Sequence, residues 1–374
     1  MSLSLEDVRA AARRLGNRIH RTPVIACQSF DDACAYQVFF KSENLQRAGA
    51  FKIRGTLNKL LTLTAGERAR GVVAFSSGNH AQGVALAARM VGTTALLCMP
   101  KDAPALKLEA TRNYGAEVVL YDRLSDDREQ LVRAIVERTG RIPIPPYDDP
   151  AVMAGQGTAA LELFEDVPSL DALLTPVGGG GLMAGCSTAA KALFPGLQIF
   201  GVETDSANDT FLSFRRGGRV TILPPSTIAD GIRGTTPGVL TFPILQSNVN
   251  DILLVSDGEV RAAVRFLAFR ARVIVEPTGA VPAAAILAGR LPLERGARVG
   301  VILSGGNIDP ALLSRSCSRI SRHGAPGAAR DAPAEPWRPS ILRALTSDES
   351  RGSRPSRAGR AGRASARGDT SAAG

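Results

Sequence analysis

Apolar residues follow two alternating patterns along this chain, short continuous runs and runs with helical spacing. The continuous runs predict strands at residues 38–41, 71–75, 94–99, 117–121, 172–176, 198–203 and 299–303. Helical spacing predicts a helix at residues 5–15, with Ser4 as its N-cap. It predicts further helices at residues 54–63, 80–90, 104–114, 127–139, 155–163, 182–193, 257–271 and 280–288.

Strands alternate with helices, which is typical of parallel sheets covered by helices on both faces. Residues 141–150 contain four prolines and interrupt the alternation, so we expect a linker there. From Arg315 onward Arg, Ala, Gly, Ser and Pro dominate without apolar periodicity. Such a segment cannot bury enough surface to offset its ordering entropy, and we expect disorder over residues 315–374.

Composition and charge exclude several classes of protein. The chain of 374 residues is 44% apolar but only 5% aromatic, which suits α/β layers better than a β-sandwich. The net charge is +10, and the twelve arginines and five acidic residues from Arg315 onward account for +7 of it. The remainder is close to neutral, so we expect no nucleic-acid-binding groove.

Cysteine usage and the N-terminus indicate the compartment. The five cysteines are irregularly spaced, which argues against a disulfide framework and against a zinc site. Residues 1–17 are polar and charged without an apolar signal core, and no apolar run approaches the length of a membrane span. We therefore expect a cytoplasmic protein without membrane association. The cysteines are Cys27, Cys34, Cys98, Cys186 and Cys317.

Lys52 is a lone lysine between Phe51 and Ile53. An amine held among apolar groups loses stabilisation of its charged form and becomes available as a nucleophile. A neutral amine can form a Schiff base with an aldehyde such as pyridoxal phosphate (PLP). Most lysines are solvated surface groups, so Lys52 gains meaning only together with the turns that follow it.

Three turns follow predicted strands. Residues 76–80 read Ser-Ser-Gly-Asn-His at a helix start, which is either a seat for a substrate carboxylate or an ordinary helix cap. The four glycines at 178–181 favour a phosphate cradle over a structural turn, although they lack the lysine of a P-loop. Ser304 ends the last strand. Since parallel sheets bind ligands at the carboxyl ends of their strands, we expect Ser304 in the same crevice.

Carboxylates cluster after the strand predicted at 198–203. Glu203 and Asp209, with a backbone carbonyl, would supply the oxygen ligands that Mg²⁺ or Ca²⁺ prefers. A solvated acidic turn explains the same residues equally well. His80 has no partner that would mark it for acid–base work, and no Ser/His/Asp triad can be assembled.

The order of these motifs resembles the fold-type II PLP enzymes of the threonine/serine dehydratase and serine racemase family. The resemblance runs from about residue 21 to residue 309. It is carried by Lys41-x-Glu43-x-x-Gln46, Phe51-Lys52-x-Arg54-Gly55, Ser76-Ser77-Gly78-Asn79-His80-x-Gln82-Gly83, Gly155-Gln156-Gly157-Thr158, Gly178-Gly179-Gly180-Gly181, Ala229-Asp230-Gly231, Glu276-Pro277 and Ser304-Gly305-Gly306-Asn307.

The resemblance implies a role for each matching position. The cofactor residues are the Schiff-base lysine Lys52 with Phe51 beside it, Asn79 at the PLP 3-hydroxyl, Ser304 at the pyridine nitrogen, and Gly178, Gly179, Gly180 and Gly181 at the phosphate. The substrate carboxylate would bind at Ser76, Ser77, Gly78, Asn79 and His80. A divalent cation would bind at Glu203, the Ala207 carbonyl and Asp209. In racemase-like members Ser77 is the second catalytic acid/base, opposite Lys52.

The resemblance also implies an architecture: two doubly wound parallel-sheet domains with the cofactor in the cleft between them. A large domain would comprise residues 1–68 and 147–314, and a small domain residues 69–146. A homodimer is expected. The chain departs from the family pattern at Ala50, where a serine is usual. It also lacks the regulatory C-terminal domain of biosynthetic threonine deaminases, so feedback by isoleucine is not expected.

The implied activity is that of an L-threonine/L-serine ammonia-lyase (dehydratase) acting on a small β-hydroxy amino acid. A serine partner should leave the PLP ring nitrogen largely neutral, which favours prompt loss of the β-hydroxyl over transamination. The alternatives are a serine racemase, a 3-hydroxyaspartate ammonia-lyase, or a non-catalytic PLP-binding regulatory protein. A nucleic-acid binder with a basic tail would instead bind with steep salt dependence.

Overall fold

The computed structural model describes residues 3–76, 78–103, 105–122 and 125–317. Ser77, a predicted site residue, lies outside the described residues, as do positions 318–374 of the segment predicted to be disordered. Helix α14 (Pro310–Cys317) includes the first three residues of that segment, and Ser316 is buried. The described chain therefore continues as a helix past Arg315.

A six-stranded sheet has the order β1-β2-β10-β7-β8-β9. β1 pairs antiparallel with β2, and every other neighbouring pair is parallel. Every residue of β7 is buried, as expected for a strand with helices on both faces of its sheet. The strands are β1 (Val24–Ala26), β2 (Gln37–Lys41), β7 (Ala172–Pro176), β8 (Gln198–Thr204), β9 (Asp251–Val255) and β10 (Arg298–Ile302).

A second, four-stranded sheet is parallel throughout and has the order β5-β4-β3-β6. Its strands are β3 (Val72–Phe75), β4 (Ala95–Pro100), β5 (Glu117–Tyr121) and β6 (Ile142–Pro143). This sheet falls within residues 69–146, the proposed small domain. The two sheets confirm the predicted class of two parallel-sheet α/β layers, with β1 as an antiparallel edge strand.

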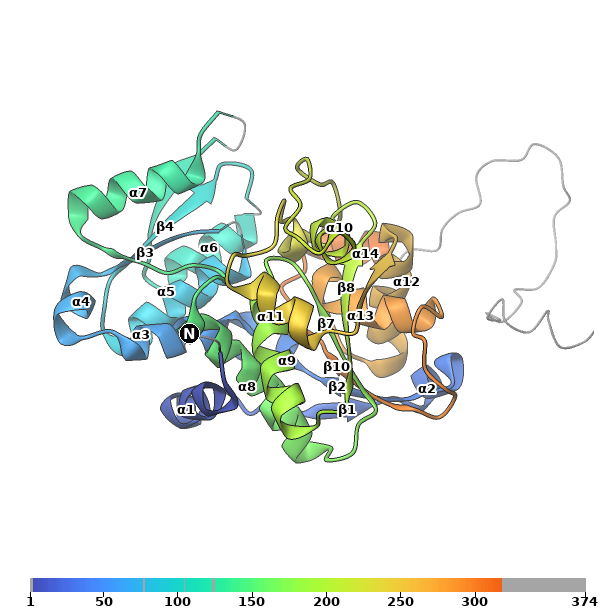
Figure 1. The fold of residues 1–374 in the computed structure, drawn as a ribbon. Helices are drawn as coiled ribbons and strands as arrows, with labels where there is room; N and C mark the ends of the chain where they lie inside the picture. The colour runs from blue at the N-terminus through green and yellow to red at the C-terminus, as the bar shows by residue number, and fades with distance from the viewer. Residues whose placement is uncertain (1–2, 77, 104, 123–124, 318–374) are drawn as a thin grey trace, which may run out of the picture. The chain divides into compact units, whose positions relative to one another are not determined.

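Helices cover both sheets, as Figure 1 shows for α9 and α13 around β7 and for α5 and α7 around β3. The α-helices that precede α14 are α1 (Leu5–Leu15), α2 (Gln28–Cys34), α3 (Lys52–Thr62), α4 (Ala65–Arg70), α5 (Asn79–Val91), α6 (Ala105–Asn113), α7 (Arg128–Thr139), α8 (Pro150–Asp166), α9 (Gly181–Leu193), α10 (Asp209–Arg216), α11 (Thr241–Asn248), α12 (Asp257–Phe266) and α13 (Pro277–Leu287). Within the described residues, no helix combines the length and apolarity needed to cross a membrane.

Local sequence accounts for where several helices begin. The Ser4 hydroxyl accepts a hydrogen bond from the Asp7 N–H, and Asp7 bonds back to Ser4, so α1 begins with the predicted cap. The Asp127 side chain caps α7 and the Asp149 side chain caps α8, which has Pro150 as its first residue. Residues 141–150, predicted as a linker, therefore contribute both the short strand β6 and the start of α8.

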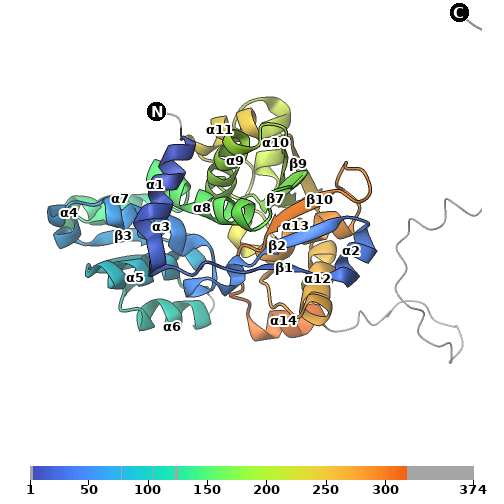
Figure 2. The same ribbon diagram turned by 90° about the horizontal axis from the view of Figure 1, so that it is seen from below.

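Helix α3 joins the two sheets, because it packs against α5 on one side and α8 on the other (Figure 2). Its crossing with α8 depends on glycine: a Cβ on Gly155 would lie 2.5 Å from the Arg54 carbonyl oxygen. The apolar side chains Ile53, Leu57 and Leu60 of α3 are buried in the core beneath the small sheet. This packing fixes the start of α3, where Lys52 lies.

Candidate active site

Lys52 is the first residue of α3 and lines a cavity of ≈ 220 Å³ at the carboxyl ends of β3, β7 and β10. Its Nζ donates a hydrogen bond to the Pro146 carbonyl at 2.8 Å and lies 5.1 Å from the centre of the Phe51 ring. Burial lowers the pKa of Lys52 to about 8. A substantial fraction of this amine is therefore neutral near physiological pH, which suits a nucleophile.

The glycine run at 178–181 connects β7 to α9 and lies along the same cavity. Gly180 has a φ of 92° and is the N-cap of α9, so its position favours glycine. A Cβ on Gly179 would lie 2.3 Å from the Tyr147 ring, and one on Gly181 would lie 2.8 Å from the Tyr147 Cβ. The absence of side chains leaves a backbone-lined cradle at a helix start, which fits a phosphate group.

Ser304 and Asn79 lie along the cavity with Lys52. Ser304 is buried just after β10, and its carbonyl accepts a hydrogen bond from the Phe51 N–H at 3.0 Å. Asn79 donates through Nδ2 to Glu276 Oε1 at 2.5 Å, while its Oδ1 accepts a hydrogen bond from Asn307 at 2.9 Å. Two side chains therefore fix the orientation of the Asn79 amide.

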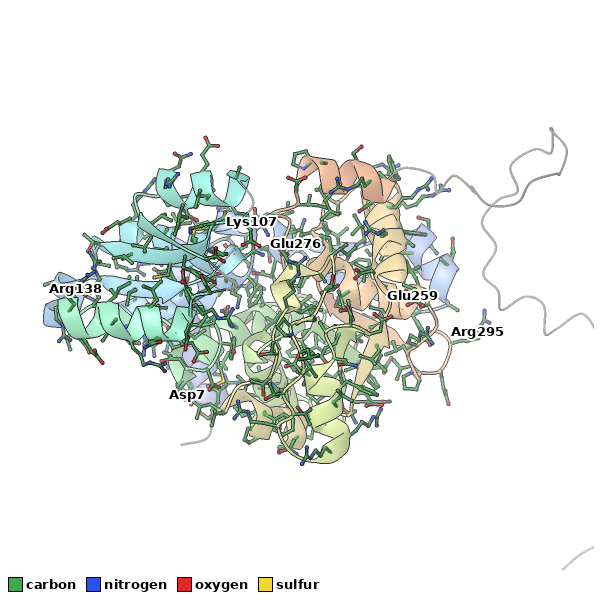
Figure 3. The ribbon with its side chains drawn as sticks, turned by 90° about the horizontal axis from the view of Figure 1, so that it is seen from above. Asp7, Lys107, Arg138, Glu259, Glu276 and Arg295 are labelled. Atoms are coloured by element: carbon green, nitrogen blue, oxygen red, sulfur yellow. The ribbon has the colours of Figure 1, made fainter. Side chains whose placement is uncertain are left out.

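Glu276 is a buried carboxyl group between the two sheets, with Lys107 opposite it (Figure 3). Burial raises the pKa of Glu276 to about 7, partly offset by the charge of Lys107. Lys107 in turn pairs with Asp230 at 2.5 Å. Glu276 Oε2 has no hydrogen-bond partner among the described residues, so this acid can hold or release a proton near neutral pH.

The cavity is also lined by the residues between β3 and α5 and at the start of α5, namely Ser76, Gly78, Asn79 and His80. The Ser76 hydroxyl accepts a hydrogen bond from the Gly78 N–H at 3.1 Å, and Gly78 is the N-cap of α5. The first N–H groups of α5 are therefore at hand for an anion. The side chain of Ser77, which the resemblance makes a catalytic acid/base, is outside the described residues.

His80 is buried and electrically neutral. Burial, and then the charge of Lys52, lowers the pKa of His80 to about 3. Its Nε2 lies 2.9 Å from the Ile144 carbonyl, which can only accept, so Nε2 carries the proton. This side chain is a neutral support for the turn and not a general acid at neutral pH.

Glu203 and Asp209 lie together at the end of β8 and the start of α10, with the buried Ala207 between them in the chain. Glu203 accepts hydrogen bonds from the Thr210 and Phe211 N–H groups at 3.2 and 2.8 Å. Both oxygens of Asp209 are buried without a hydrogen-bond partner among the described residues. An orphaned carboxylate beside a second one fits a divalent cation.

The two carboxyl groups have raised pKa values. Burial raises the pKa of Asp209 to about 6, and burial together with the charge of Asp209 raises the pKa of Glu203. Among the described residues no cluster of three His, Cys, Asp or Glu side chains could hold a metal ion. A cation here would therefore need main-chain carbonyl oxygens such as that of Ala207 as further ligands.

Sequence reasoning missed several residues that line the cavity. Tyr147 comes from the predicted linker, Arg128 from the start of α7, and Arg233 from the loop after Asp230. No local motif marks these positions, because each reaches the cavity through the way distant segments pack. The Ala229-Asp230-Gly231 motif lies near Arg233, and Arg128 falls in the helix predicted at 127–139, but neither signal indicates a role in the cavity.

Comparison with known proteins identifies the class. Residues 15–305 match the family model described as pyridoxal-phosphate dependent enzyme, and the chain belongs to this family. It is a fold-type II enzyme that uses PLP, as the motifs predicted. The relatives include ammonia-lyases, in agreement with the predicted lyase class.

Individual relatives differ in their reactions. The chain is 50% identical to an L-threo-3-hydroxyaspartate ammonia-lyase of Pseudomonas sp, over 82% of this chain and 96% of that protein. It is 42% identical to an L-threonine ammonia-lyase of Thermotoga maritima, over 84% of this chain and 78% of that protein. The crystal structure of serine racemase from Dictyostelium discoideum is 38% identical, with a TM-score of 0.77 over 83% of this chain and 100% of that one.

The burial of Lys52 predicts a pH dependence. In the cofactor-free protein its acylation rate should rise with pH to a midpoint near 8, because only the neutral amine reacts. A solvated lysine titrates at about 10.4. Competitive acetylation with mass spectrometry of peptides measures this, with the exposed Lys101 as an internal comparison. Identical profiles for the two lysines would contradict the assigned burial.

Proposed function

We propose that this protein is a PLP-dependent ammonia-lyase that converts a β-hydroxy amino acid into a 2-oxo acid and ammonia. The observation that carries the proposal is that the amine of Lys52 and the glycine cradle at 178–181 line one cavity. L-Threonine and L-serine are the substrates expected from the sequence, and they would give 2-oxobutanoate and pyruvate.

Four parts of the cavity would hold the cofactor. Lys52 would bind the aldehyde carbon, the glycine cradle the phosphate, Ser304 the ring nitrogen and Asn79 the 3-hydroxyl. Glu276 and Asn307 orient the Asn79 amide. When bound, PLP supplies an electron sink for the charge that remains after a proton leaves the substrate Cα.

The protein's own groups would then move protons and hold the substrate. The Lys52 amine, freed when the substrate amine takes its place, would remove the Cα proton, since its pKa of about 8 suits a base at neutral pH. The N–H groups at the start of α5 hold the substrate carboxylate. The β-hydroxyl would leave as water with the proton that Lys52 had taken, and a second water molecule would later replace the nitrogen, which would be released as ammonia.

A second candidate substrate is 3-hydroxyaspartate, which has an additional carboxylate. Arg128 and Arg233 line the cavity, and a guanidinium group binds a carboxylate well. Racemisation of serine is the third candidate. It would require an acid/base such as Ser77 on the face opposite Lys52.

A substrate panel separates these candidates. Wild-type protein is mixed with L-threonine, L-serine or L-threo-3-hydroxyaspartate, and 2-oxo acid release is followed together with chiral analysis of the remaining amino acid. We expect 2-oxo acid from at least one of them, and none from Lys52→Ala, which loses the base. D-Serine formed without much pyruvate would identify a racemase. Cofactor binding without any product would favour the regulatory alternative.

We also propose that Glu203, the Ala207 carbonyl and Asp209 bind Mg²⁺ or Ca²⁺. A bound cation would relieve the repulsion between two buried carboxylates. At 100 times its Kd, such a cation would stabilise the fold by about 2.7 kcal/mol.

The metal site can be tested by thermal unfolding with Ca²⁺, Mg²⁺ or a chelator. We expect the wild-type Tm to rise with at least one cation and Asp209→Asn to lose that rise. Asp205→Asn is the matched control, because Asp205 is an exposed carboxylate in the same turn. A cation response that survives in Asp209→Asn would disprove the site.

A homodimer in the cytoplasm is proposed as well. All five cysteines are free, as a reducing compartment would keep them.

Phe269 (63% exposed), Ile274 (47%) and Leu45 (51%) are large apolar side chains open to solvent. Leu45 lies near Ile274, because the side chain of its neighbour Asn44 donates a hydrogen bond to the Ile274 carbonyl. Sedimentation should give twice the chain mass of 39.2 kDa, and Ile274→Ser should weaken the dimer. A species of single-chain mass would refute the proposal.

A further inference from the structure

We propose that Asp148 is a positioning residue for the phosphate cradle, because its carboxylate fixes the segment 238–241 that holds the Gly179 carbonyl. The inference rests on the proposed role of Gly178–181 as the phosphate site. Asp148 itself is not among the residues that line the cavity, so its effect on the cofactor would be indirect.

The Asp148 carboxylate accepts three main-chain hydrogen bonds. Oδ2 accepts from the Val239 N–H at 2.9 Å, and Oδ1 accepts from the Leu240 and Thr241 N–H groups at 2.8 and 3.2 Å. These groups lie at the start of α11, whose N-cap residue Leu240 has no side-chain oxygen to offer. Asp148 therefore caps a helix that begins more than ninety residues later in the chain, and its charge suits that helix end.

The anchored segment holds one carbonyl of the cradle from two directions. The Thr241 hydroxyl donates to the Gly179 oxygen at 2.6 Å, and the Gly238 N–H donates to the same oxygen at 3.3 Å. The C=O and N–H of a trans peptide point in opposite directions. Fixing the Gly179 carbonyl therefore also fixes the direction of the Gly180 N–H, which points away from the segment.

Close packing makes this arrangement rigid. A Cβ on Gly238 would lie 2.4 Å from Asp148 Oδ1, and a Cβ on Gly180 would lie 2.8 Å from the Thr241 hydroxyl oxygen. The neighbouring Tyr147 ring packs on Gly179 from its own side. Two consecutive residues thus fix the cradle. Tyr147 packs against Gly179, and Asp148 holds Thr241, whose hydroxyl donates to the Gly179 carbonyl.

The test compares the affinities of PLP and of pyridoxal, which lacks the phosphate. Full-length protein is freed of cofactor and titrated with each compound, and binding is followed by absorbance. Asp148→Ala should weaken PLP binding about tenfold, the change expected if the displaced cradle loses one charge-assisted hydrogen bond from an N–H group to the phosphate. It should leave pyridoxal binding nearly unchanged, because only the phosphate contacts the cradle.

Two further variants test the route through Thr241. Thr241→Val removes the hydroxyl that donates to Gly179 and should reproduce the selective loss of PLP affinity, whereas Thr241→Ser should retain it. The double variant Asp148→Ala/Thr241→Val should lose less than the sum of the single effects, since both act on one carbonyl. If Asp148→Ala does not fold, the isosteric Asp148→Asn takes its place, because it removes the charge and the acceptor for the Val239 N–H and should lose PLP affinity in the same selective way.

Asp309→Ala is the matched control. The Asp309 carboxylate accepts hydrogen bonds from the Ala311 and Leu312 N–H groups at the start of α14, remote in sequence from the glycine run. This variant should keep the wild-type ratio of the two affinities. Equal losses for PLP and pyridoxal in Asp148→Ala, or no loss of PLP affinity, would overturn the inference. If the wild type itself does not prefer PLP to pyridoxal, the phosphate cradle is wrong, which is a separate failure.

Discussion

The start of helix α3 is the point on which the rest of the site depends. There the Phe51 N–H bonds to the Ser304 carbonyl after β10, and Lys52 Nζ bonds to the Pro146 carbonyl after β6. The same helix packs against α5 and α8. One helix end is thus connected to both sheets, and this brings the reactive amine to the carboxyl ends of their strands.

Buried charges behind Lys52 hold that helix end in place. Arg54 and Glu43 are both fully buried and meet in two hydrogen bonds of 2.7 and 2.8 Å, and Arg54 also bonds to Glu162 at 2.7 Å. Buried ion pairs of this kind contribute little net stability, but their geometry is directional. They fix the orientation of α3 relative to α8 and to the turn that follows β2, and so the direction in which the Lys52 side chain points.

The electrostatics of the cavity suit an amine that must lose its proton. Lys52 has a lowered pKa, His80 is neutral, and Glu276 titrates near neutrality beside the Lys107–Asp230 pair. Each of these shifts has burial as its largest cause. Excluding solvent therefore favours the neutral form of the Lys52 amine. It also strengthens the electrostatic attraction of an anionic ligand to the glycine cradle, Arg128 and Arg233.

The sequence allowed prediction of those features that are local. The glycine run and Ser304 could be proposed because each lies in a short motif directly after a strand, and Lys52 because it lies between apolar neighbours just before a predicted helix. The helix predicted at 54–63 begins two residues earlier, at Lys52, and the one predicted at 257–271 continues past Phe266 only as a π-helical turn over Leu267–Ala271. β9, α10 and α11 were not predicted, although residues 252–255 form a continuous apolar run and α10 is amphipathic. The roles of Tyr147 and Asp148 could not be foreseen, since they depend on contacts with glycines and a helix start far away in the chain.

Reduction of the PLP-loaded protein with borohydride, followed by peptide mapping, identifies the amine that binds the cofactor. We expect a single stable pyridoxyl-phosphate adduct, located on Lys52. No adduct, or an adduct on another lysine, would contradict this expectation.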